Sequence, residues 1–114
     1  MKNFEIMLES VKIAIEQVQK EFDLYQNEFF TKRSPEFFCL ELNGEAGELA
    51  NAEKKLWKGK EVAHEHLADE AADVLIALMN YSNARKIDLG SALALKLCKI
   101  EVMRKELQSR GEEY

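Results

Sequence analysis

The apolar residues of the first 29 positions recur at alternating intervals of four and three. The series is Phe4, Leu8, Val11, Ile15, Val18, Phe22, Tyr25 and Phe29. This heptad spacing is typical of a helix that packs along a partner helix. We therefore predict one helix over residues 2–29, paired with a helix of the same chain or of a second copy.

Capping residues and the helical period predict three further helices. Ser34 followed by Pro35 favours a helix start, because serine caps a helix N-terminus and proline suits its first position. Gly59 favours a helix end, since glycine readily follows a helix in the left-handed conformation. Asp88 is a candidate N-cap for the last helix. The expected helices are Pro35–Trp57, residues 63–85 and Leu89–Ser109.

Strand-like alternation is absent from the sequence, and the connections between the expected helices are short. These features predict an all-α fold, in the form of an antiparallel four-helix bundle. A chain of 114 residues is long enough for one hydrophobic core and suits a single domain over residues 1–114.

The charge balance limits the expected partners. With 16 basic and 21 acidic side chains the net charge is −5, which argues against nucleic acid and against an anionic membrane as partners. The longest apolar run, residues 74–79, is too short to span a bilayer. No leader-like segment opens the chain, so we expect a cytoplasmic protein. Cys39 and Cys98 are expected to be reduced thiols in the core.

Acidic residues share a face with large apolar residues on two of the expected helices. Glu41, Glu45 and Glu48 fall in one sector of the second helix at 100° per residue. Glu70 and Asp73 lie one turn apart on the third helix. Carboxylates that are partly buried together are costly unless a cation neutralises them.

The two acid pairs predict a metal site. An antiparallel helix pair would place Glu45-x-x-Glu48 opposite Glu70-x-x-Asp73. Four oxygen ligands without histidine or thiolate suit Mg²⁺, with Mn²⁺ as a substitute. The plainer alternative is that each motif is an ordinary feature of an acidic helix.

The same segments resemble the MazG-like family of all-α nucleoside triphosphate pyrophosphohydrolases. The resembling stretches are Leu-Asn-Gly-Glu-Ala-Gly-Glu-Leu at 42–49 and Glu-Ala-Ala-Asp-Val-Leu-Ile at 70–76. The likeness extends over residues 34–104 and is greatest to short, single-domain members of the dCTP pyrophosphatase type. Two positions differ, because Lys55 stands where those members carry tryptophan and Ile100 where some relatives carry asparagine.

The resemblance implies Mg²⁺-dependent hydrolysis of nucleoside triphosphates, deoxynucleotides favoured, to a monophosphate and pyrophosphate. Its expected role is house-cleaning of the nucleotide pool by a homodimer or a dimer of dimers. The family's metal-binding and catalytic acids fall on Glu45, Glu48, Glu70 and Asp73, one of which would orient or deprotonate the attacking water.

Several other side chains are candidates for substrate binding, each with a structural alternative. A lysine or arginine could contact phosphate or pair with exposed acids, an aromatic ring could stack on a base or pack in the core, and Asn80 falls in the sector of the acids. Glu41 could support the metal ligands or lie at the rim. The candidates are Lys55, Asn80, Lys96, Arg104, Glu41 and Phe30.

Two other functions are compatible with a helical chain. The heptad pattern of the first helix favours a non-catalytic interaction protein. A carboxylate-bridged di-iron bundle needs two Glu-x-x-His motifs, and only Glu61-x-x-His64 is present.

Overall fold

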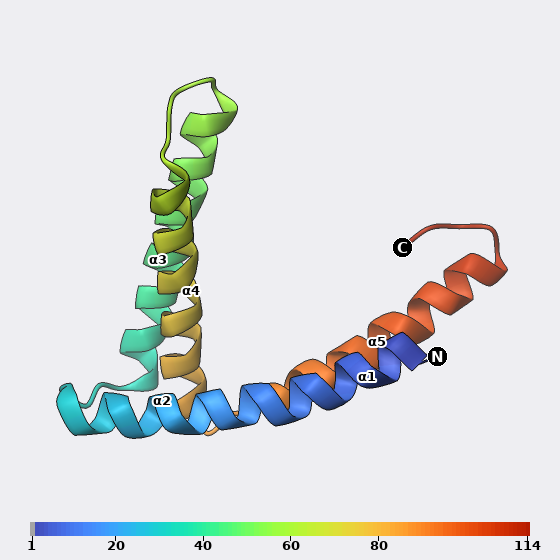
Figure 1. Ribbon diagram of the computed structural model, residues 1–114, viewed down its shortest axis with the longest axis horizontal. Helices are drawn as coiled ribbons and strands as arrows, with labels where there is room; N and C mark the ends of the chain where they lie inside the picture. Colours follow the sequence, from blue (N-terminus) through green and yellow to red (C-terminus); the bar gives the residue numbers. More distant parts are fainter. Residues whose placement is uncertain (1) are drawn as a thin grey trace. The chain divides into compact units, whose positions relative to one another are not determined.

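The computed structural model describes residues 2–114, and every regular element in that range is helical (Figure 1). The predicted all-α class is confirmed. None of the described helices combines the length and the hydropathy that a membrane crossing requires. The elements are α1 (Lys2–Ser10), the π-helical turn η1 (Val11–Ile15), α2 (Glu16–Phe29), α3 (Pro35–Trp57), α4 (His64–Ala84) and α5 (Leu89–Ser109).

The chain forms two compact units. One joins the residues up to Glu21 with Asp88–Tyr114, and the other is Phe22–Ile87. In the first unit α5 packs against η1, and in the second α3 packs against α4. The four-helix bundle and the single domain therefore stay predictions.

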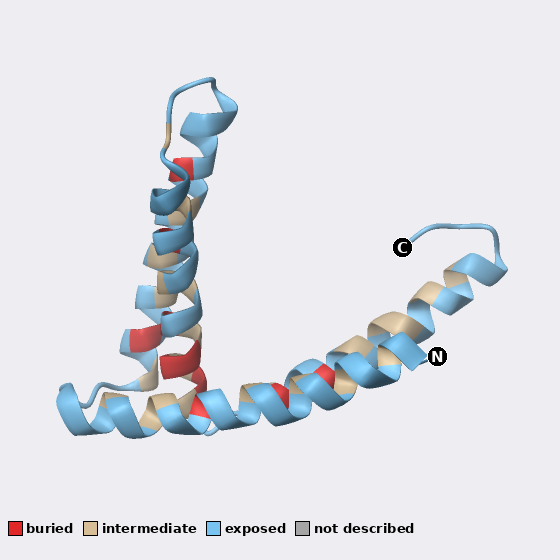
Figure 2. Cartoon of the chain, in the orientation of Figure 1, coloured by how far each residue is buried: buried red, intermediate tan, exposed pale blue. Residues whose placement is uncertain are grey.

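Helices α3 and α4 form an antiparallel hairpin with well-defined ends (Figure 1). Ser34 caps α3 as predicted, since its hydroxyl accepts a hydrogen bond from the Phe37 amide. Gly59 ends α3 with a φ of +86°, and the Lys60 amide donates to the Lys55 carbonyl, which is a Schellman motif. Figure 2 shows buried residues of this unit where the two helices face each other.

The first helical segment departs from the predicted continuous heptad pattern. Phe4, Leu8, Val11 and Ile15 are half-buried as expected, but Val18 is 51% exposed. Gln19 is buried instead. A π-helical turn contains more residues than an α-helical turn. After η1 the buried position therefore falls one residue later, on Gln19 instead of Val18.

The two buried residues of α5 are small. Leu93 and Met103 are exposed, whereas Gly90 and Ala94 are buried. A Cβ atom on Gly90 would lie 3.3 Å from the carbonyl oxygens of Val11 and Lys12. Glycine therefore permits the close approach of α5 to η1.

The prediction that the two cysteines lie in the core is wrong. Cys39 and Cys98 are free thiols and both are exposed. Among the described residues α3 packs mainly against α4 and α5 packs mainly against η1, and most positions of α3 and α5 are exposed.

Replacing Gln19 should destabilise the first unit. The Gln19 side-chain oxygen accepts a hydrogen bond of 2.9 Å from the Leu89 amide, the first of α5. Gln19→Met keeps the size and removes the acceptor, so the free energy of unfolding should fall by about 1–3 kcal/mol. Urea denaturation measures the loss. Gln17→Met is the control, because Gln17 is exposed, and an equal loss in both variants would contradict the account.

Candidate carboxylate site

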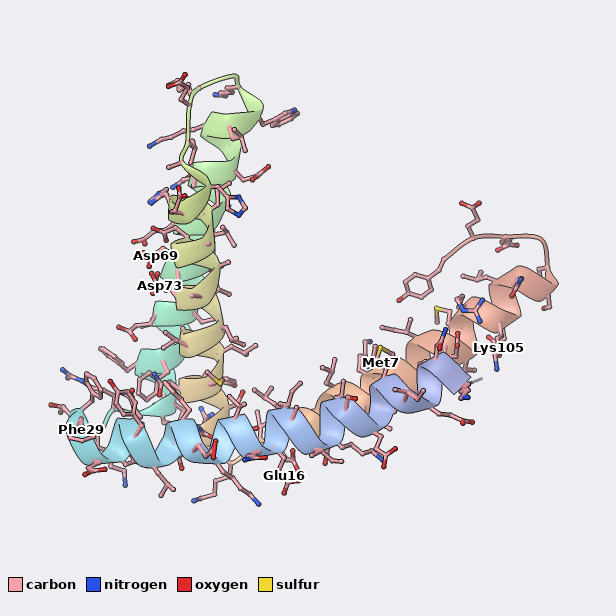
Figure 3. All side chains as sticks on the ribbon, in the orientation of Figure 1. Met7, Glu16, Phe29, Asp69, Asp73 and Lys105 are labelled. Carbon is pink, nitrogen blue, oxygen red and sulfur yellow. The ribbon has the colours of Figure 1, made fainter. Side chains whose placement is uncertain are left out.

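Three of the four predicted metal ligands lie together between α3 and α4. Glu45 comes from α3, and Glu70 and Asp73 come from α4. Each offers one oxygen, and these oxygens lie within 4.8 Å of one another. Asp73 is labelled on α4 in Figure 3. We call Glu45, Glu70 and Asp73 the carboxylate cluster.

Two oxygens of the cluster are buried without a hydrogen-bond partner. They are one carboxylate oxygen (Oε2) of Glu45 and one of Glu70, and Glu70 is only 9% exposed. A buried and unpaired charged oxygen is costly in a folded protein. A divalent cation would supply the missing partner for both oxygens, and oxygen donors of this kind suit Mg²⁺ or Mn²⁺. The residues present therefore fit the expected metal.

The cluster raises the pKa of two of its carboxyl groups. Burial is the largest cause of the raised pKa of Glu45, and the negative charges of Glu48, Asp73, Glu70 and Glu41 add to it. Burial also leads for Glu70, where the neighbouring Glu48 raises the pKa further and His66 partly offsets it. Both raised pKa values indicate that positive groups of the protein do not balance the negative charge of the cluster.

Glu48 and Glu41 lie beside the cluster rather than in it. Glu48 is exposed and acts electrostatically on both Glu45 and Glu70. Glu41 is exposed and influences Glu45. The predicted set of four is thus divided by the structure into three clustered acids and one neighbour, Glu48.

A cavity of about 440 Å³ adjoins Glu48 and Glu70. We call it the hairpin pocket, because its walls come from the end of α3, the loop after it and the start of α4. Lys55, a predicted substrate-binding residue, lines this pocket together with Glu48 and Glu70. Its lining also includes Asn51, Glu61 and His66.

His66 and Asn51 are pocket residues that the sequence analysis did not select. The Nε2 atom of His66 lies 3.8 Å from a carboxylate oxygen (Oε1) of Glu70. Helical spacing was the available signal, since His66 is four residues before Glu70 and Asn51 is three after Glu48. An exposed histidine beside an acid gave no reason to rank it above an ordinary surface residue.

Asn80 and Phe30 lie away from the carboxylate cluster. Asn80 is buried and lines a different cavity of the same unit. Phe30 lies against Tyr25, with ring centroids 5.6 Å apart in an edge-on arrangement. Phe30 lines neither the hairpin pocket nor the cavity that Asn80 lines. Its predicted role in substrate binding therefore has no support from the described contacts.

Lys96 and Arg104 both belong to α5, in the first unit. Lys96 is exposed. Arg104 donates from Nε to Glu101 and from its terminal nitrogen to Gln108. The salt-bridged alternative for Arg104 is therefore the one observed, and phosphate binding by either residue stays a prediction.

Comparisons with models of known protein families, with curated proteins and with solved structures found no match to this chain.

The raised pKa values predict how stability depends on pH. Between the ordinary glutamate pKa of about 4.3 and the raised values, the metal-free folded protein binds more protons at Glu45 and Glu70 than the unfolded chain does. The free energy of unfolding contributed by these groups is therefore highest in acid and falls as the pH rises through the raised pKa values.

Comparing the wild type with Glu70→Gln isolates this contribution. Carboxyl groups outside the cluster, such as Asp88 with its lowered pKa, titrate alike in both proteins and cancel in the difference. Urea denaturation in chelator should show that Glu70→Gln gains stability relative to the wild type as the pH is raised from 4 towards 7. A difference that is independent of pH would contradict the assignment.

Proposed function

We propose that this protein is a Mg²⁺-dependent nucleoside triphosphate pyrophosphohydrolase, acting on deoxynucleotides in preference, in nucleotide-pool house-cleaning. The observation that carries the proposal is the carboxylate cluster, whose two buried oxygens have no partner in the described structure. It adjoins a pocket that contains both acids and cations. The sequence resemblance points to the same reaction.

In this proposal Glu45, Glu70 and Asp73 hold the cation. Bound Mg²⁺ polarises a phosphoryl oxygen and lowers the pKa of a bound water. The three carboxylates fix its position across the hairpin, because they come from both helices. Mn²⁺ would serve in its place, since it accepts the same oxygen ligands.

Glu48 is the acid that we assign to the attacking water. It is exposed, lines the hairpin pocket and lies beside Glu70. The water oxygen bonds to the α-phosphorus, the bond from that phosphorus to the α–β bridging oxygen breaks, and pyrophosphate leaves with the bond's electron pair. The Glu48 carboxylate accepts the proton that the water loses.

Lys55 and His66 are placed to contact the leaving pyrophosphate. Both line the hairpin pocket beside Glu48. The Lys55 ammonium is a compact positive charge on a flexible chain, which suits phosphate. Asn51 adds a neutral hydrogen-bonding group to the same wall. A lysine that was only an ordinary exposed residue at the end of the helix would not need to share a pocket with these groups.

Substitutions that remove one negative charge should distinguish the carboxylates of the cluster from other acids on the same helix. Asp73→Asn should lower the kcat for deoxynucleoside triphosphates by about 100-fold or more, and Mn²⁺ affinity by more than about tenfold. Asp69→Asn is the matched control, because Asp69 is exposed on the same helix (Figure 3). Ion-exchange separation of products and Mn²⁺ paramagnetic resonance give the two readouts.

Cation binding by Asp73 and activation of the water by Glu48 predict different results. Glu48→Gln should abolish turnover while it retains Mn²⁺ binding, because Glu48 is assigned to the water and not to the cation. Equal turnover in Asp73→Asn and Asp69→Asn would remove the cluster from the mechanism.

We also propose that the protein acts as a homodimer or a dimer of dimers. Large apolar side chains are exposed on the hairpin: Leu40 is 75% exposed, Leu75 is 54% exposed and Trp57 is 86% exposed. Exposed apolar surface of this kind marks protein contacts, and a second copy is the partner of closed homo-oligomers.

Light scattering after gel filtration should give at least twice the mass of 13.1 kDa. Leu75→Glu should lower the measured mass, because burying an unpaired charge opposes association. Lys58→Glu, at the exposed end of α3, is the control. A wild type that is monomeric at micromolar concentration would contradict this part of the proposal.

The alternative, a non-catalytic interaction protein, drew on the heptad pattern of the first helix. Within the first unit, η1 already packs against α5 of the same chain. Half-buried Val11 and Ile15, which belong to η1, accordingly have less need of a separate partner. The enzymatic proposal explains the unpaired buried carboxylate oxygens, which an interaction protein would not need.

A further inference from the structure

The second unit contains another cavity of about 440 Å³, two helical turns from the carboxylate cluster. Phe38 lines it from α3, seven residues before Glu45, and Asn80 lines it from α4, seven residues after Asp73. Seven residues are close to two turns, or about 10 Å along a helix axis. This cavity therefore lies on the same faces of α3 and α4 as the cluster. We call it the basic pocket.

The buried part of the basic pocket combines an aromatic ring with an amide. Phe38 is 6% exposed and Asn80 is 7% exposed. Both side chains line the cavity. The Asn80 amide therefore offers a hydrogen-bond donor and an acceptor beside an aromatic ring.

The rim of the pocket is positively charged. Lys32, Arg33 and Lys86 line it and are exposed, whereas Asp23 is its one acidic residue. Arg33 is held by stacking over the Phe37 ring, 4.8 Å from its centroid. The charged donors thus lie at the entrance, and the neutral groups lie at the base of the pocket.

This arrangement suits a nucleobase better than a phosphate. A phosphate is held best by charged donors that contact it directly. A nucleobase is a neutral planar ring, whose edge pairs with an asparagine amide and whose face contacts an aromatic side chain. The cations at the rim would attract the anionic nucleotide to the entrance.

The order of sites along the hairpin matches the order of groups in a nucleotide. Along α3 the basic pocket residue Phe38 comes first, the cluster residue Glu45 follows and the hairpin pocket residue Lys55 comes last. A substrate with its α-phosphate at the cluster and its pyrophosphate towards Lys55 would extend its base in the opposite direction.

We infer that the basic pocket holds the nucleobase of the substrate, with Asn80 hydrogen-bonded to the edge of the base and Phe38 in contact with the ring. The inference rests on the proposed function for the identity of the ligand as a nucleotide. It makes Asn80 the residue that determines base preference, although Asn80 lies outside the carboxylate cluster.

Asn80→Asp tests the hydrogen bond with little change in side-chain size. An ionised carboxylate only accepts hydrogen bonds, so it should favour bases that present an amino group over bases that present a carbonyl group. The ratio of kcat/KM for dCTP and dATP to that for dUTP and dGTP should rise about tenfold or more over the wild type. Asn43→Asp is the control, because Asn43 is exposed on α3, and its ratio should stay that of the wild type.

Inorganic triphosphate and free deoxynucleosides separate this inference from the proposed function. Hydrolysis of inorganic triphosphate, which has no base, should be unaltered in Asn80→Asp. In chelator, millimolar deoxynucleoside should shift the side-chain amide NMR signals of Asn80 in the wild type, even if no triphosphate is hydrolysed.

Three outcomes would overturn the inference. They are an unchanged base preference in Asn80→Asp, an equal loss with inorganic triphosphate, and Asn80 signals that do not move with any deoxynucleoside. Failure of the proposed function has a different signature, namely the absence of turnover with every triphosphate while the Asn80 signals still respond to deoxynucleosides.

Discussion

The repulsion among carboxylates held between two helices is the constraint on which the candidate site depends. Glu45, Glu70 and Asp73 bring their oxygens within 4.8 Å of one another, and burial makes their negative charges harder to sustain. His66, 3.8 Å from Glu70, offsets this charge only in part. Such an arrangement stores unfavourable free energy that a divalent cation would relieve, which is why we attribute it to function rather than to stability.

The hairpin is the device that imposes this arrangement. A serine cap starts α3 and a Schellman motif ends it, so the chain reverses within a few residues. The helical repeat then places groups on one face at successive heights. In our proposal this single face carries the base, the cation and the pyrophosphate of one substrate, in that order.

The sequence predicts the helices and the acids well, because both signals are local. Caps at Ser34 and Asp88 lie where they were expected, and helical spacing brings Glu45, Glu70 and Asp73 to one side. The π-helical turn could not be predicted, since it accompanies the close approach of Gly90, which is distant along the chain. The helical period predicted the face of α4 on which Asn80 lies. Asn80 is seven residues beyond Asp73, however, so it lines a different pocket from the acids. The exposure of Cys39 and Cys98 was missed because the prediction assumed that neighbouring helices would cover both.

Hydrolysis in ¹⁸O-labelled water, followed by ³¹P NMR, tests the central claim most directly. If water attacks the α-phosphorus at the carboxylate cluster, the heavy isotope will appear in the nucleoside monophosphate and the pyrophosphate will remain unlabelled. Label in pyrophosphate or in released orthophosphate would contradict the proposed cleavage. Absence of turnover with all nucleoside triphosphates in Mg²⁺ would contradict the enzymatic function itself.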